Sequence, residues 1–278
     1  MKIAFLADIH SNWPALEAVL QHLKASRPDR VVVAGDTINR GPNPRRCLEK
    51  TLELAGQDGW LLMRGNHEDY VLHAPGRISQ LRPWEQEVCA HTLWTHDHIR
   101  AYRDTIAAWP EHIELEGPDG GLIRVVHASM HGNRVGLYAF MDDAELHDKT
   151  APGVPVLCAG HTHIPFIRWI GDRLILNAGA VGMPFDRDPR ASYALISWTE
   201  TGWKPEIVRV PYDQGETVRL YHETGYLANG GAMVPLILRE LLESRSWLGP
   251  WHREYEPRVA AEEMTVADSV QAMIQSRT

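Results

Sequence analysis

Short apolar runs alternate with amphipathic stretches over the first 65 residues of the chain. Three runs of four or five mostly apolar side chains have the length of buried β-strands: residues 3–7, 31–34 and 60–63. Between the first two, apolar side chains recur at helical spacing behind a possible cap at Ser11 or Asn12: Leu16, Val19, Leu20 and Leu23. Residues 45–54 predict a second helix. This β-α-β-α-β order predicts parallel strands with right-handed crossovers.

The pattern of apolar and polar residues predicts other elements in the rest of the chain. Residues 69–110 lack strand-like runs and predict a helical insertion beside the sheet. Shorter runs then predict a second, antiparallel or mixed sheet: residues 122–126, 154–157, 173–176, 192–197 and 205–210. Beyond residue 212 the pattern is helical, with an irregular connector at 247–257 and a capping box at Thr265 and Asp268. We predict an α/β fold (α+β in some schemes), with a catalytic domain over 1–212 and a helical extension over 213–278 packed on it.

Polar motifs follow the apolar runs. They are Asp8-Ile9-His10, Gly35-Asp36, Gly65-Asn66-His67-Glu68, His127 and Gly160-His161-Thr162-His163. A single Asp after a strand is usually a turn or a helix cap, and His-x-His alone is a weak metal signal. Five such motifs in order at strand ends supply the oxygen and imidazole ligands that two divalent transition-metal ions need. Asp36, directly after a buried strand, is suited to bridging both ions.

Charge and hydropathy narrow the function classes. The formal net charge of −8 argues against broad binding to nucleic acid or anionic membranes. The first residues lack a signal-peptide pattern, and no run reaches the roughly 20 apolar residues of a membrane span. The three cysteines show neither zinc nor redox spacing. We therefore expect a cytoplasmic protein that does not enter a membrane.

The motif order resembles the calcineurin-like metallophosphoesterase superfamily. Residues 12–20 and 177–182 resemble its bacterial phosphodiesterase and phosphatase branch. The resemblance implies a two-sheet β-sandwich flanked by helices. It also implies hydrolysis of a phosphate ester by in-line attack of a hydroxide that bridges two ions, most simply Mn²⁺, or Fe with Zn²⁺.

The resemblance also assigns roles by position. One ion would be held by Asp8, His10, Asp36 and His163, and the other by Asp36, Asn66, His127 and His161. His67 would serve as general acid toward the leaving alcohol, or as a hydrogen-bond donor to the phosphate, and Arg40 as the phosphate-binding arginine. Asn39 stands where the family's serine/threonine phosphatases carry an Asp, and Ala128 stands where a Gly is usual. Asn39 and Trp13 complete the predicted substrate contacts, although Trp13 is favoured as a lid over the first helix.

Two function classes stay open at this point. The first is a phosphoesterase acting on a small-molecule phosphate ester or a nucleotide, with a phosphoprotein as another substrate. The second is a non-catalytic binding module that keeps the fold for partner docking. Enzymes that act on any of these substrates share the same metal ligands, so the ligands do not indicate which substrate this protein hydrolyses. The oligomeric state is also left open.

Overall fold

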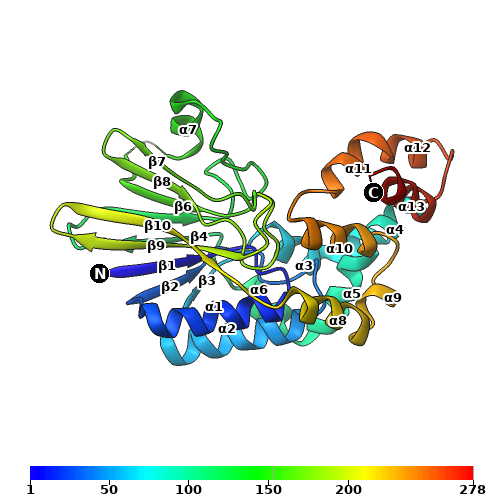
Figure 1. Cartoon of the computed structure of the whole chain (residues 1–278), viewed down its shortest axis with the longest axis horizontal. Helices are drawn as coiled ribbons and strands as arrows, with labels where there is room; N and C mark the ends of the chain where they lie inside the picture. Colours follow the sequence, from blue (N-terminus) through cyan, green and yellow to red (C-terminus); the bar gives the residue numbers. More distant parts are fainter. Residues whose placement is uncertain (152, 278) are drawn as a thin grey trace.

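Two five-stranded sheets face each other in the computed structural model, which describes residues 1–151 and 153–277 (Figure 1). The order in the first sheet is β10 (Gly202–Val210), β9 (Ala191–Thr199), β1 (Lys2–Leu6), β2 (Arg30–Val33) and β3 (Leu61–Leu62). The order in the second is β4 (His112–Glu116), β5 (Leu122–Val126), β6 (Val156–Ala159), β8 (Arg173–Asn177) and β7 (Phe166–Ile170). The predicted fold class, two sheets flanked by helices, is confirmed.

Strand β1 is buried on both faces, which explains its continuous apolar run. Ile3 and Phe5 lie in the core between the sheets, and Ala4 and Leu6 lie in the core under the helices. Helices α1 (Trp13–Ser26) and α2 (Pro44–Asp58) flank the first sheet (Figure 1). Asn12 caps α1 by accepting a hydrogen bond from the amide of Ala15, at 3.3 Å.

The predicted helical insertion is present. It comprises α3 (Asn66–Ile78), α4 (Pro83–Val88), α5 (Ala90–Ile99), the 3₁₀ turn η1 (Arg100–Tyr102) and α6 (Arg103–Ala107). Its first helix begins at Asn66, three residues before the expected boundary, so a predicted metal ligand occupies the first turn of the helix.

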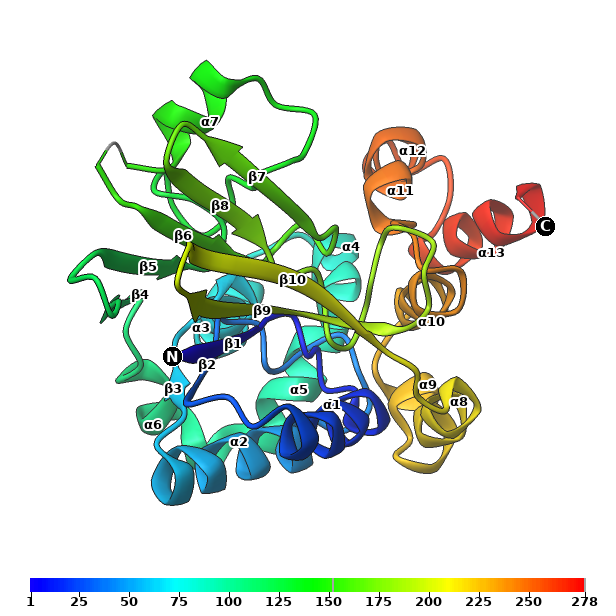
Figure 2. The same ribbon diagram turned by 60° about the vertical axis from the view of Figure 1, so that its left-hand side comes forward.

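The chain beyond β10 is helical, as expected. It forms α8 (Gln214–Glu223), α9 (Tyr226–Asn229), α10 (Val234–Glu243), α11 (Leu248–Glu254), α12 (Glu256–Ala260) and α13 (Val266–Ser276). Helix α9 packs on α5 and α13 on α4, so both lie beside the insertion, whereas α8 packs on α1 (Figure 2). Whether residue 212 separates two domains stays a prediction. Within residues 1–151 and 153–277, no helix has the length and apolar character needed to cross a membrane.

Two predictions about elements are wrong, and three elements were not predicted. Strands β9 and β10 belong to the first sheet, because β9 pairs antiparallel with β1, rather than to the second sheet. Residues 247–257 form α11 and α12 instead of an irregular connector, because Pro250 and Pro257 fall in first turns, where no backbone N–H is required. The short elements β4, β7 and α7 (Asp143–Lys149) were not foreseen.

Candidate active site

The seven predicted ligands gather at one edge of the sandwich. Each follows the carboxyl end of a strand: Asp8 and His10 follow β1, Asp36 follows β2, Asn66 follows β3, His127 follows β5, and His161 and His163 follow β6. Parallel strands end at the same edge, so residues up to 155 positions apart become neighbours. The side chains are buried or nearly so.

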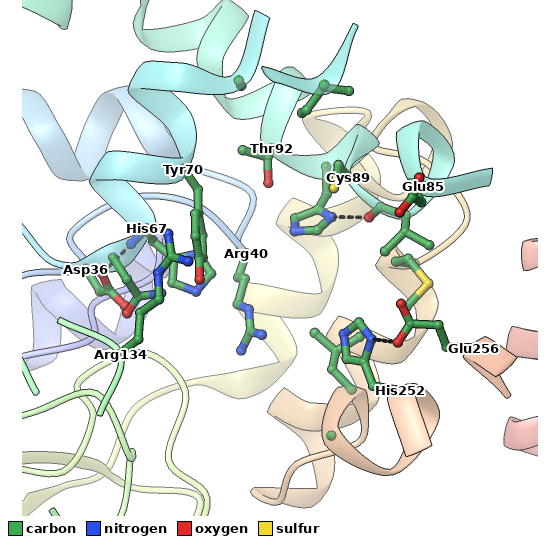
Figure 3. Close-up of a pocket in the computed structure, with 18 of the residues that line it drawn as sticks. Asp36, Arg40, His67, Tyr70, Glu85, Cys89, Thr92, Arg134, His252 and Glu256 are labelled. Carbon is green, nitrogen blue, oxygen red and sulfur yellow. Dashed lines mark hydrogen bonds and ion pairs between the residues drawn. The ribbon is translucent and has the colours of Figure 1, made fainter. Parts of the chain in front are cut away.

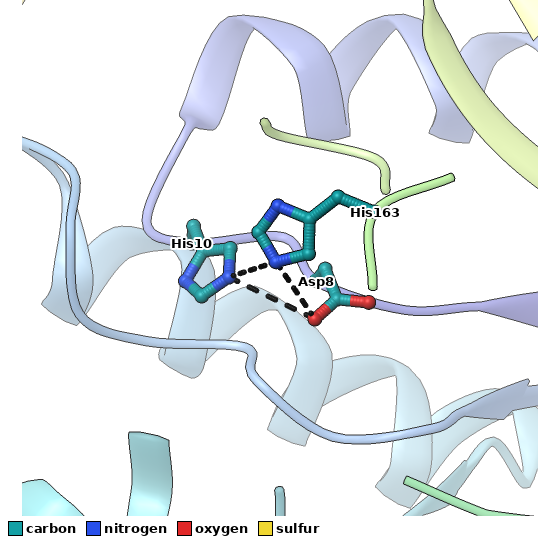
Figure 4. A group of neighbouring side chains, drawn as sticks. All are labelled: Asp8, His10 and His163. Carbon is teal, nitrogen blue, oxygen red and sulfur yellow. Dashed lines mark hydrogen bonds and ion pairs between the residues drawn. The ribbon is translucent and has the colours of Figure 1, made fainter. Parts of the chain in front are cut away.

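Asp8, His10 and His163 form the first cluster (Figure 4). Nε2 of His163 lies 3.1 Å from Nε2 of His10 and 3.3 Å from Oδ1 of Asp8. The Nδ1–H of His163 donates to the carbonyl of Met183, at 2.6 Å, so its Nε2 presents a lone pair. Oδ1 of Asp8 has no hydrogen-bond partner although it is buried. Electron-pair donors converging in this way fit a cation.

Asn66, His127 and His161 form the second cluster with Asp36. Oδ1 of Asn66 lies 2.8 Å from Nε2 of His127 and 2.9 Å from Nδ1 of His161. His127 donates its Nδ1–H to the carbonyl of Ala34, at 2.9 Å, so Nε2 is the nitrogen that faces Asn66 and is available to a cation. Oδ2 of Asp36 lies 3.3 Å from that nitrogen and 3.8 Å from Nε2 of His10. Asp36 therefore lies between the two clusters.

The charges of the site act on one another. Burial, together with His163, holds the pKa of His10 well below its usual range. Burial also disfavours charge on His127, but the carboxylate of Asp36 outweighs it and raises the pKa of His127 to about 10. Burial opposes ionisation of Asp36, yet His127 and His67 hold its pKa well below its usual range. The carboxylate of Asp36 thus favours a positive charge beside it. A bound cation would supply that charge without protonation of a histidine ligand.

The backbone at the site is strained. Five ligands adopt left-handed conformations, with φ of 55° at Asp8, 46° at His10, 55° at Asp36, 68° at His161 and 59° at His163. Such conformations are uncommon outside glycine and persist only where surrounding contacts impose them. Gly65 shows how tight the turns are, because a Cβ there would lie 2.1 Å from Oδ1 of Asp36.

Glu68 is a supporting residue to which the sequence analysis assigned no role. Its buried carboxylate accepts hydrogen bonds from the backbone amides of Asp36 and Gly65, each at 2.8 Å, and of Thr37 and Ile38, at 2.8 and 3.2 Å. It thereby fixes the turn that carries Asp36 against the start of α3. One signal was available, because Glu at the third position of a helix is half of a capping box.

His67 contacts Asn39 beside the metal ligands. The side-chain oxygen of Asn39 accepts from the amide of Arg40, at 2.9 Å, so its Nδ2 faces Nδ1 of His67, at 2.9 Å, as a donor. His67 therefore carries its proton on Nε2. Burial holds the pKa of His67 well below its usual range. Asn39 is buried and positions His67 rather than lining the cavity described next.

A cavity of about 650 Å³ opens from the metal ligands (Figure 3). Its metal end is lined by Asp36, Asn66, His67, His161 and His163, and its helical end by Trp84, Val88, Leu248, His252 and Glu256. Arg40 lies between the two ends, and Arg134 stacks on Tyr70 near the metal end, with its guanidinium carbon 4.7 Å from the ring centroid. The sequence analysis did not single out Arg134.

Trp13 does not reach this cavity. It lies in the first turn of α1, where the guanidinium of Arg46 covers its ring at 3.9 Å from the centroid. The residue packs against the core under the helices, in agreement with the favoured lid over the first helix. The structure gives no support to its contacting a substrate.

Comparison with known proteins agrees with the site. The calcineurin-like phosphoesterase superfamily domain matches residues 1–201. The chain belongs to this superfamily. Family membership identifies it as a hydrolase of phosphate esters, and it confirms the resemblance recognised in the motifs.

Individual relatives extend over most of the chain. Uncharacterized protein MJ0912 of Methanocaldococcus jannaschii is 31% identical over 76% of this chain and 88% of its own length. Phosphodiesterase YfcE of Escherichia coli K12 is 26% identical, over 70% of this chain and 87% of its own. A metallophosphoesterase structure from Sphaerobacter thermophilus, 27% identical, aligns with a TM-score of 0.66 over 88% of this chain and 99% of the other.

Proposed function

We propose that the chain is a two-metal phosphoesterase that hydrolyses a small-molecule phosphate ester. The observation that carries this proposal is the convergence of ligand atoms in two clusters that share Asp36. One ion would be held by Asp8, His10, Asp36 and His163, and the other by Asp36, Asn66, His127 and His161. The mixed oxygen and imidazole set favours Mn²⁺, or Fe with Zn²⁺, over Mg²⁺ alone.

Each neighbouring residue has a task in this reaction. Two ions held by these ligands would supply a water nucleophile that is activated at neutral pH and would stabilise charge on the phosphoryl oxygens. Arg40 binds a phosphoryl oxygen through its planar fork and orients the ester for in-line displacement. His67 points its Nε2–H at the ester and donates a hydrogen bond to the leaving oxygen or the phosphoryl group.

The name of one relative supports the phosphoesterase proposal. YfcE, which this chain resembles at 26% identity, is named a phosphodiesterase. Hydrolysis of a phosphoprotein, a cytoplasmic location and the oligomeric state stay predictions or open questions.

The proposal is tested by replacing the bridging carboxylate. Asp36→Asn should bind fewer than two Mn²⁺ ions per chain by metal analysis, and should lose hydrolysis of 4-nitrophenyl phosphate esters, because the amide cannot bridge two cations. Asp58→Asn, at the exposed end of α2, is the matched control and should behave as the wild type. Two bound ions and wild-type turnover in Asp36→Asn would refute the bridging role.

The alternative, a non-catalytic binding module, has less support. A docking surface has no need of buried ligands that converge at strained backbone positions, and none of the predicted ligands is missing here. A wild-type protein that binds no transition metal and hydrolyses no ester with Mn²⁺ would favour the module.

A further inference from the structure

Arg40, the proposed phosphate-binding residue, faces a carboxylate from the helical extension. Its Nη1 lies 3.5 Å from Oε2 of Glu240 on α10, which lies beyond the residues matched by the family domain. The side chain of Glu240 is fully buried, whereas that of Arg40 is 18% exposed. The guanidinium therefore has a buried anion behind it and the cavity in front of it.

Glu240 is held in place by the start of α11. Its Oε1 accepts hydrogen bonds from the amides of Trp247 and Leu248, at 2.8 and 2.9 Å, and from the hydroxyl of Ser246, at 3.3 Å. Its Oε2 has no hydrogen-bond partner and faces Arg40 alone. A carboxylate anchored by backbone donors cannot move away when an anionic ligand enters, so its charge is a fixed property of the pocket.

Arg40 keeps donors for a ligand in spite of this pairing. The 3.5 Å separation is longer than a good charge-assisted hydrogen bond, and its Nε is also buried without a partner. The backbone carbonyl of Arg40 accepts from the hydroxyl of Tyr221, at 3.0 Å, so α8 of the extension also fixes this residue. Arg40 is thus positioned to bind one phosphoryl oxygen with part of its charge already neutralised.

The effect of Glu240 on substrate binding depends on the charge of the substrate. At pH 8 a phosphomonoester carries about two negative charges, because its second pKa is about 6, whereas a phosphodiester carries one. A fixed anion behind Arg40 repels the additional charge of the monoester. At an effective dielectric of about 20, one such charge about 12 Å away changes binding by about tenfold, and a charge closer than this changes it more.

The shape of the cavity also favours phosphodiesters. A phosphodiester has a second organic group, which projects sideways from the phosphorus in an in-line displacement and therefore needs its own space in the cavity. Past Arg40 the cavity continues toward Cys89 and His252 (Figure 3), and the apolar side chains of Trp84, Val88 and Leu248 also line it. A volume of about 650 Å³ is typical of sites for drug-sized ligands and far exceeds what a phosphate group fills.

We propose that this site selects phosphodiesters over phosphomonoesters, and that Glu240 is the positioning residue that sets the preference. The inference rests on the proposed phosphoesterase function. Glu240 acts through Arg40 by holding the guanidinium and reducing its net charge, so that a singly charged diester is bound well and a doubly charged monoester poorly.

Two substrates with the same leaving group test this inference. We would measure kcat and KM with Mn²⁺ at pH 8 for 4-nitrophenyl phosphate, a monoester, and for 4-nitrophenyl phenyl phosphate, a diester. The wild type should have the higher kcat/KM on the diester. Glu240→Gln keeps an oxygen for the amides of Trp247 and Leu248 but removes the charge. It should lower KM for the monoester by at least about tenfold and change kcat/KM for the diester much less.

Two further variants separate charge from structure. Glu240→Asp keeps the charge and should keep the diester preference. Glu243→Gln lies on the same helix but pairs with Arg245, and it should match the wild type on both esters. A wild type that is faster on the monoester overturns the inference even if Glu240→Gln does not fold. An unchanged ratio of kcat/KM between the diester and the monoester in folded Glu240→Gln also overturns it. So does a change of that ratio in Glu240→Asp that equals the change in Glu240→Gln.

If the proposed phosphoesterase function is wrong, the same measurements give a different result. A wild type that binds no Mn²⁺ and hydrolyses neither ester refutes the phosphoesterase itself, and the inference falls with it. A wild type that binds Mn²⁺ and hydrolyses both esters, with a ratio that Glu240→Gln leaves unaltered, refutes only the role of Glu240.

Discussion

Replacing Glu68 by Gln should destabilise the protein and weaken its metal site. The carboxylate accepts four backbone N–H groups, two on each oxygen. The amide of Gln has one accepting oxygen, so two buried N–H groups lose their acceptor and face an NH₂ group instead. Each unsatisfied buried donor costs about 1–3 kcal/mol, which gives a loss of about 2–6 kcal/mol in the free energy of unfolding.

The assay is urea unfolding of the metal-free protein, followed by tryptophan fluorescence. It is best performed at pH 8, because burial and the charge of Asp36 raise the pKa of Glu68 to about 7, and the carboxylate is ionised above that value. Glu17→Gln, an exposed position on α1, is the control and should change stability by less than about 0.5 kcal/mol.

Metal binding provides a second measurement on the same variant. Glu68 holds the turn in which Asp36 adopts a φ of 55°, so Glu68→Gln should also weaken Mn²⁺ binding in titration calorimetry. A loss of less than about 1 kcal/mol, together with wild-type Mn²⁺ affinity, would show that the four hydrogen bonds do not maintain the site.

Two other substitutions probe the inner packing of the site and its proton donor. Gly65→Ala should abolish Mn²⁺ binding in calorimetry, because the new Cβ would lie 2.1 Å from Oδ1 of Asp36; Gly56→Ala in α2, with open space around it, should bind normally and gain about 0.5–1 kcal/mol in stability. Asn39→Asp should stabilise a protonated His67 by accepting its Nδ1–H, so kcat for alkyl esters should rise relative to 4-nitrophenyl esters. An unchanged alkyl-to-aryl ratio would argue against proton donation by His67.

Local patterns were enough to find the strands that carry the metal ligands. The apolar runs before Asp8, Asp36 and Asn66 correspond to β1, β2 and β3, and parallel strands deliver their carboxyl ends to one edge. The placement of β9 beside β1 was missed, because nothing local in a strand near residue 195 specifies that its partner lies at the start of the chain.

The outer parts of the site depend on contacts that no local pattern encodes. The partner of Arg40 lies 200 positions away on α10, in a segment outside the recognised motifs. Asn39 was noticed as a departure from the family pattern, but only the structure shows that its amide nitrogen faces His67. The helices at 247–257 were missed because a segment with two prolines is typical of a connector, although Pro250 and Pro257 each lie in a first turn.

The ligands come from both sheets of the sandwich. Asp8, His10, Asp36 and Asn66 follow strands of the first sheet, whereas His127, His161 and His163 follow strands of the second. Ions held as proposed would therefore cross-link two layers that also pack against each other through apolar side chains in the core between them. The two layers could then not slide over each other without breaking metal–ligand bonds. Metal binding should therefore stabilise the whole sandwich against unfolding.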